Sequence, residues 1–129
     1  MSLEQYFKTT EGTGFLSTAD KTGAVNAAVY AKPHLFEDGT AAFIMTNSRS
    51  YKNIQETPHA VYLYREGAGG FRGKRLYLTK TREEQDTELL QSLRRRTYSD
   101  EQEALMKPLH LVFFKIDSER KLVDHSGEK

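Results

Sequence analysis

The chain has 129 residues, enough for a single domain (residues 1–129) that buries about two-thirds of its unfolded surface without a disulfide or a metal. It contains no cysteine, which excludes disulfides, thiolate metal sites and a cysteine nucleophile, and fits a reducing compartment. Nineteen Lys and Arg against eighteen Asp and Glu leave a net charge of +1, so no overall field draws the protein to nucleic acid or a membrane. The N-terminal residues lack the apolar run of a signal peptide and no apolar stretch approaches a membrane span, so a cytoplasmic protein is expected.

The first part of the chain predicts strands joined by tight turns. An apolar run at residues 15–18 leads into residues 20–23, a turn ending in glycine, where a positive φ costs little. Residues 24–32 resume with small and β-branched side chains, which favours a hairpin. The Asp-Gly pair within residues 37–39 marks a second turn, and residues 40–46 form a short apolar strand after it.

The middle of the chain predicts one short helix followed by strands. Residues 47–56 are polar, with Ser48 and Ser50 as candidate N-caps, and a proline shortly afterwards ends the helix. Residues 60–64 and 75–79 have the composition and alternation of strands, and a glycine-rich loop separates them.

Two capping patterns predict helices in the last third of the chain. Thr81 and Glu84 form a capping box that begins a helix running to about Arg96. Ser99 repeats the pattern and begins a second, shorter helix. Residues 109–116 are apolar and form the last strand.

The elements together indicate a mainly β fold with flanking helices, of the α+β class. The count is about six strands, mostly connected by hairpins, with one main helix and short satellites. Many short strands with glycine turns favour a small closed barrel, because closure removes exposed sheet edges.

The segment at residues 43–54 carries the strongest indication of chemistry. A buried strand delivers Thr46 and Asn47 to its end, and two serines, an arginine and a lysine follow at the start of a helix. Helix N-termini present unpaired N–H groups and partial positive charge, so added hydroxyls and cations there make a phosphate site. Taken alone, such a short polar motif more often marks a strand-turn-helix junction with solvated charges.

Three stretches resemble the pyridoxamine 5′-phosphate oxidase-like family, whose members have an FMN-binding split β-barrel. The first is residues 14–34, the second is residues 43–64, which includes the helix-ending Asn-Ile-x-x-Thr-Pro, and the third is residues 70–78. No single motif is specific, but their order and spacing are specific jointly. The resemblance implies a six-stranded antiparallel split β-barrel and an FMN-binding flavoprotein in redox chemistry, a flavin-dependent oxidoreductase or an electron carrier.

The resemblance also implies where FMN would lie. In the family the segment matching residues 46–52 holds the phosphate and the strand matching residues 28–32 runs along the flavin ring, although plain β-core packing explains its small residues equally well. The basic stretch at residues 72–82 would face phosphate from a partner subunit, or simply solvent. The candidate cofactor-binding residues are Ala28, Val29, Tyr30, Ala31, Lys32, Met45, Thr46, Asn47, Ser48, Arg49, Ser50, Lys52, Asn53, Arg72 and Arg75.

The resemblance implies a homodimer with FMN in a groove between two subunits, and a small-molecule or protein electron donor or acceptor as a further partner. Aromatic residues are enriched at interfaces, and Tyr62, Tyr64, Phe71 and Tyr77 are more aromatics than a small barrel interior readily accepts. No metal site is expected, because the four histidines show no ligand spacing.

Two departures from the family limit the prediction. The oxidases end in an Arg-x-x-x-x-Arg-Leu-His-Asp type segment that completes the substrate site, and this chain lacks it, so vitamin B6 oxidation is not expected. Tyr51 stands where the oxidases have an arginine, although Arg49 lies close enough in sequence to compensate. Two alternatives stay open: a haem-binding relative on the same barrel, with His34 or His59 as axial ligand, or a binding domain without a cofactor.

Overall fold

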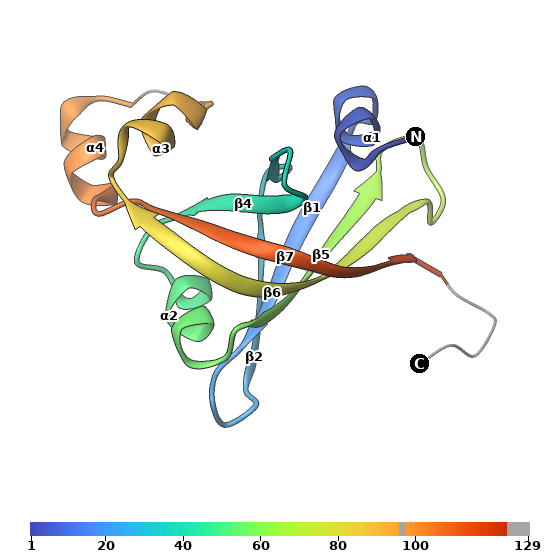
Figure 1. The fold of residues 1–129 in the computed structure, drawn as a ribbon, viewed down its shortest axis with the longest axis horizontal. Helices are drawn as coiled ribbons and strands as arrows, with labels where there is room; N and C mark the ends of the chain where they lie inside the picture. Colours follow the sequence, from blue (N-terminus) through green and yellow to red (C-terminus); the bar gives the residue numbers. More distant parts are fainter. Residues whose placement is uncertain (96–97, 124–129) are drawn as a thin grey trace.

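A computed structural model describes residues 1–95 and 98–123 of the chain. Within these residues one antiparallel sheet is flanked by short helices (Figure 1). The strands are β1 (Gly12–Ala19), β2 (Val25–Val29), β3 (His34–Leu35), β4 (Thr40–Met45), β5 (His59–Glu66), β6 (Gly73–Gln85) and β7 (His110–Lys121). The helices are α1 (Leu3–Thr9), α2 (Arg49–Glu56), α3 (Glu88–Leu93) and α4 (Asp100–Met106).

The sheet confirms the mainly β class, but the prediction of six strands in a closed barrel is wrong. The described residues form seven strands in the order β2-β1-β5-β6-β7-β4-β3, because the two-residue strand β3 adds one more. The edge strands β2 and β3 follow each other in the chain but do not pair, so the sheet curls without closing. Pro33 lies between them and has no N–H to donate to a ladder, which helps keep these edges apart.

The helix predicted from Thr81 to about Arg96 is also wrong over its first half. Residues up to Gln85 belong to β6, which pairs with β7 along almost its full length. Thr81 donates a hydrogen bond to the Phe113 carbonyl instead of capping a helix. The helix that does form is α3, and its cap is Thr87. The long β6–β7 ladder therefore overrides a local capping signal, and the predicted end at Arg96 lies outside the described residues.

The other capping predictions hold in part. Ser48 caps α2 by accepting a hydrogen bond from the Tyr51 N–H, whereas Ser50 is a buried residue inside that helix. Ser99 forms a capping box at the start of α4, as its pattern predicts. Helix α1, capped by Ser2, was not predicted, because residues 1–10 show no clear apolar periodicity.

The core consists of two apolar clusters on opposite faces of β4 and β7. Phe43 and Phe114 belong to one cluster, and Ala42 and Phe113 belong to the other, as the alternation of side chains along a strand requires. Leu90 of α3 completes the second cluster. The α3–α4 segment therefore packs against the end of the sheet where β6 ends and β7 begins (Figure 1).

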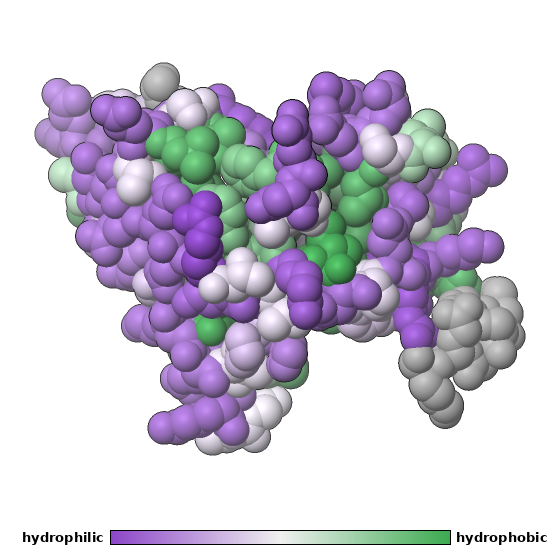
Figure 2. All heavy atoms as spheres, viewed as in Figure 1, coloured by the Kyte–Doolittle hydropathy of each residue, from purple (hydrophilic) through white to green (hydrophobic). Residues whose placement is uncertain are grey.

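The face shown in Figure 2 is largely hydrophilic. Apolar residues gather on it between the α3–α4 side of the molecule and the α1 side, with hydrophilic residues around them. Among the described residues, no helix is long and apolar enough to cross a membrane.

Candidate functional site

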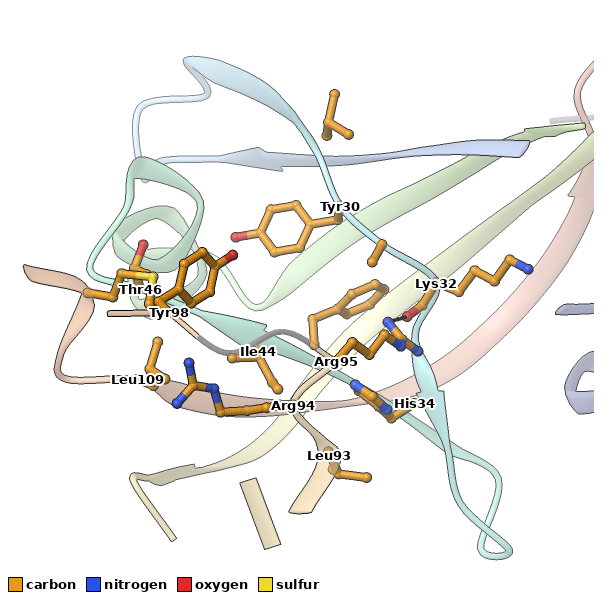
Figure 3. A pocket seen from close by; sticks show the side chains of 14 residues that line it. Tyr30, Lys32, His34, Ile44, Thr46, Leu93, Arg94, Arg95, Tyr98 and Leu109 are labelled. Atoms are coloured by element: carbon orange, nitrogen blue, oxygen red, sulfur yellow. Dashed lines mark hydrogen bonds between the residues drawn. The ribbon is translucent and has the colours of Figure 1, made fainter. Parts of the chain in front are cut away.

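A pocket of about 490 Å³ lies between the chain that links β2 to β3, strand β4 and the α3–α4 segment (Figure 3). This volume falls in the range of small-molecule and cofactor sites. Its lining residues are Val29, Tyr30, Ala31, Lys32, His34, Phe43, Ile44, Thr46, Leu93, Arg94, Arg95, Tyr98, Met106 and Leu109.

One end of the pocket is formed by Thr46 and Tyr98 (Figure 3). Thr46 follows β4 directly and leads into the start of α2, where unpaired backbone N–H groups gather. Arg49 and Lys52 are exposed on this helix, and neither forms an ion pair with a described residue. Ser50 is turned inward, where the Asn26 amide donates to its hydroxyl at 3.4 Å.

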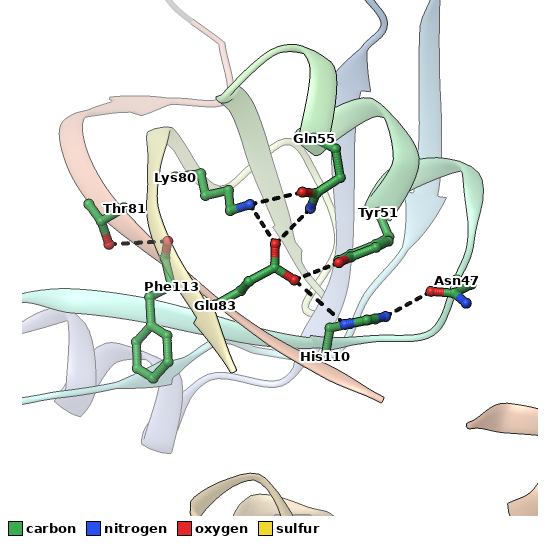
Figure 4. Close-up of polar contacts among 8 residues, drawn as sticks. All are labelled: Asn47, Tyr51, Gln55, Lys80, Thr81, Glu83, His110 and Phe113. Carbon is green, nitrogen blue, oxygen red and sulfur yellow. Dashed lines mark hydrogen bonds and ion pairs between the residues drawn. The ribbon is translucent and has the colours of Figure 1, made fainter. Parts of the chain in front are cut away.

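A buried histidine supports the link between β4 and α2 from behind (Figure 4). Nε2 of His110 lies 2.7 Å from Oδ1 of Asn47, and the imidazole stacks on the Tyr51 ring with centroids 3.8 Å apart. Its Nδ1 is 3.5 Å from a Glu83 oxygen and makes no hydrogen bond with a described residue. Asn47, predicted to bind the cofactor, is therefore engaged in holding this segment in place.

Glu83 connects the same cluster to the sheet (Figure 4). Its carboxylate accepts hydrogen bonds from Tyr51 at 2.6 Å, Lys80 at 2.7 Å and Gln55 at 2.9 Å. Burial raises the pKa of Glu83, but these hydrogen bonds and the Lys80 charge outweigh it and hold the pKa below its ordinary value. Burial and the Glu83 hydrogen bond raise the pKa of Tyr51 to about 12, so its hydroxyl stays a donor.

The opposite end of the pocket is formed by His34, Lys32 and Arg95 (Figure 3). Arg95 donates to the Lys32 carbonyl at 2.8 Å. The Lys32 ammonium itself donates to the Phe7 carbonyl near the end of α1, at 2.6 Å, so the pocket receives its stem and not its charge. Burial, helped by the Arg95 charge, lowers the pKa of His34 to about 4, which makes its ring neutral at neutral pH.

The middle of the pocket is apolar, with Tyr30, Phe43 and Leu93 among its walls. The Tyr62 hydroxyl fixes the chain there by donating to the Tyr30 carbonyl at 3.1 Å. This hydrogen bond passes over Gly14, where a Cβ atom would collide with the Tyr62 hydroxyl. A glycine in β1 therefore permits the close packing that sets the wall of the pocket.

The structure brings part of the predicted site together. Five predicted residues line the pocket, and five more lie at the β4–α2 junction beside it. The first group is Val29, Tyr30, Ala31, Lys32 and Thr46, and the second is Asn47, Ser48, Arg49, Ser50 and Lys52.

The remaining predicted residues do not line the pocket. Met45 is buried in the core, and buried Asn53 donates to the Thr18 hydroxyl at 3.1 Å, so both serve packing. Ala28 pairs with Leu16 of β1 in the edge strand β2. Arg72 is exposed in the turn before β6, and Arg75 donates to the Lys121 carbonyl at 2.8 Å.

Sequence reasoning missed the contribution of the α3–α4 segment. Arg94, Arg95 and Tyr98 line the pocket, although the arginines were expected to belong to a helix end. His34 also lines it, whereas His59 is exposed and lies 3.1 Å from the Thr79 hydroxyl. No group of three acidic or histidine side chains among the described residues is arranged to hold a metal ion.

Comparison with known proteins gives structural matches only. No family model and no curated protein matches the sequence. An FMN-binding protein from Syntrophomonas wolfei subsp. wolfei has a TM-score of 0.71 and 22% identity, over 92% of this chain and 82% of that one. A candidate pyridoxamine 5′-phosphate oxidase from Lactobacillus delbrueckii has a TM-score of 0.67 and 13% identity, over 93% of each chain. HutZ, a haem storage protein from Vibrio cholerae, has a TM-score of 0.62 and 16% identity, over 92% and 91%.

These matches span nearly the whole of each chain at identities too low to carry function, so they establish the fold. They agree with the open, curled antiparallel sheet and its flanking helices. The chain has the pyridoxamine 5′-phosphate oxidase-like split-barrel fold.

Proposed function

We propose that the protein binds FMN in the pocket beside α2 and works in redox chemistry, as a flavin-dependent oxidoreductase or an electron carrier. The observation that carries the proposal is the pairing of an apolar pocket with two unpartnered cations. Thr46 lines the pocket, and Arg49 and Lys52 follow it on α2 without a carboxylate among the described residues. A phosphate monoester carries nearly two negative charges, which two cations and helix N–H groups balance.

The residues present fit the other parts of FMN as well. Tyr30, Phe43 and Ile44 offer an apolar wall for a planar ring, and the backbone of residues 29–32 runs along it. Bound FMN would supply the electron transfer, so this chain's residues bind and orient the ring and limit the access of water. A small molecule or a protein would donate or accept the electrons.

The solved structures of this fold support the proposal. One is described as an FMN-binding protein and another as an F420 reductase, so flavin-like cofactors occur on the fold. We also propose a cytoplasmic location, because a chain without cysteine suits a reducing compartment.

A fluorescence titration tests FMN binding directly. Protein added to FMN should quench its fluorescence and give a saturable curve. Thr46→Val removes one hydroxyl from the proposed phosphate site and should weaken binding by several-fold, as expected for a lost hydrogen bond. Thr13→Val, at an exposed position on β1, is the matched control and should leave the curve unchanged. Equal losses in both variants would exclude Thr46 as a phosphate contact.

Haem is the second candidate, because His34 stands in the pocket. Its ring is neutral and makes no hydrogen bond with a described residue, so a nitrogen is available as a ligand. HutZ, described as a haem storage protein, shares the fold. If haem is the cofactor, the protein should give a Soret band with haemin that shifts in His34→Ala and stays unchanged in His59→Ala.

We also propose that the protein is a homodimer that uses the outer face of β2. Val25 and Val29 are 82% and 70% exposed, and Ala27 between them is exposed on the same face. A strand with one open edge and an exposed apolar face is a feature that soluble proteins normally cover. Of the four aromatic residues expected at the interface, Tyr62 and Tyr64 are buried in the core, whereas Phe71 is 73% exposed. Light scattering at micromolar concentration tests the dimer.

A further inference from the structure

We propose that the His34–Arg95 end of the pocket binds the carboxylate of a small organic acid with an apolar body, which would be the substrate or effector of the bound cofactor. The inference rests on the proposed function for its role, because the cofactor would occupy the Thr46 end. FMN has a single phosphate. If that phosphate lies at the Thr46 end, the Arg95 charge at the opposite end of the pocket has no counter-charge from the cofactor.

Arg94 and Arg95 are neighbours in the chain and both line the pocket, but they differ in what neutralises their charge. Arg94 pairs with Glu103 at 2.6 Å, and their side chains are only 14% and 24% exposed. Arg95 makes one hydrogen bond, to a backbone carbonyl, and pairs with no carboxylate among the described residues. Most of its five N–H donors and its full charge therefore remain available at the pocket.

The surroundings of Arg95 favour an oxyanion. His34 lies beside it in the pocket (Figure 3) and is neutral, so it adds a ring N–H donor without adding charge that would need its own partner. The planar guanidinium matches a carboxylate or a phosphate through two parallel hydrogen bonds. Lys32 cannot take over this role while its ammonium is held by the Phe7 carbonyl.

The pocket walls define the rest of the ligand. Leu93 presents apolar surface next to the cationic end, and Tyr30 and Phe43 line the side along which the proposed flavin ring would lie, so a bare inorganic ion would leave the apolar surface between them unused. A ligand with one anionic group and a flat apolar body satisfies both parts. The proposed ligand class is therefore an aromatic or other apolar organic acid.

Calorimetric titration with benzoate, benzamide and phenyl phosphate tests this inference, because benzamide keeps the shape of benzoate without its charge. Both the apoprotein and the FMN-loaded protein are titrated. Benzoate should bind at least tenfold more tightly than benzamide. Arg95→Gln should reduce benzoate affinity about tenfold, which corresponds to one charge-assisted hydrogen bond at an exposed site, and leave benzamide unchanged. Arg65→Gln, at an exposed position on β5, is the control.

The titrations distinguish a failure of the carboxylate site from a failure of FMN binding. Equal affinities for benzoate and benzamide, or an equal loss in both arginine variants, would overturn the carboxylate site even where FMN binds. If the protein binds benzoate more tightly than benzamide in an Arg95-dependent way but does not bind FMN, the anion site is supported and the FMN proposal is refuted. If phenyl phosphate binds more tightly than benzoate, the anionic group that the site recognises is a phosphate and not a carboxylate.

Discussion

Replacing Arg49 by Gln should weaken FMN binding about tenfold and leave riboflavin binding almost unchanged, because riboflavin lacks the phosphate. Arg49 is exposed at the start of α2 and pairs with no described carboxylate, so its full charge is available to a ligand. A hydrogen bond to a charged group contributes about 1.5–3 kcal/mol, and the exposed position favours the lower end. About 1.4 kcal/mol corresponds to each tenfold change in affinity.

The same reasoning extends to Lys52, three residues further along the same helix. Positions three apart lie on one side of a helix, so both cations can reach a single phosphate. Lys52→Gln should also cost about tenfold, and the double variant up to about a hundredfold if the two contributions add. The difference between wild type and variants should shrink in about 1 M salt, where the screening length falls to ~3 Å.

Equilibrium fluorescence titrations of FMN and riboflavin, run in parallel on each variant, give the result. Arg65→Gln serves as the control for removing an exposed arginine elsewhere. If the variants lose FMN and riboflavin equally, these residues do not contact the phosphate. If FMN affinity stays constant in the double variant, the phosphate lies elsewhere and the placement of FMN beside α2 is wrong.

Three further predictions concern the scaffold. Gly14→Ala should lower the free energy of unfolding by about 2–3 kcal/mol in denaturant titrations, because its Cβ would displace the Tyr62 hydroxyl from its hydrogen bond; an unchanged midpoint would contradict that packing. The depressed pKa of Glu83 contributes stability above its ordinary value of 4.5 that is lost as pH falls through the lower folded value, so the stability gap between wild type and Glu83→Gln should narrow below about pH 4.5. A difference in unfolding free energy between wild type and Glu83→Gln that stays constant down to pH 2 would contradict this role of Glu83. Val29→Lys should convert the proposed dimer into a monomer by light scattering, whereas a dimeric variant would place the interface away from β2.

Local sequence signals identified the elements that neighbouring residues stabilise, such as turns and capped helices. The turn residues and short apolar runs gave the strands, and the Ser48 and Ser99 hydroxyls cap the helices that their patterns predict. The Thr81 pattern failed because pairing between β6 and β7 over their length outweighs one cap. The sheet's open edges also depend on pairing between distant segments, which no local window contains.

The candidate site also contains a part that local sequence can indicate and a part that only tertiary packing creates. Thr46 and the α2 cations are close in sequence, so one motif could indicate them together. Arg95 and His34 are brought together only by packing of the α3–α4 segment against the sheet, and a run of arginines gives no sign of that. Tyr62 and Tyr64 have the composition of an interface, but the curl of the sheet buries them in the core.

The central claim, that the pocket beside α2 holds FMN, is tested most directly by an absorption spectrum of the purified protein after incubation with FMN or haemin and removal of free cofactor. We expect flavin bands that stay with the protein at about one FMN per chain, and no retained Soret band. A retained Soret band that depends on His34, with no retained flavin, would replace FMN by haem. A colourless protein after both incubations would leave a binding domain without either cofactor.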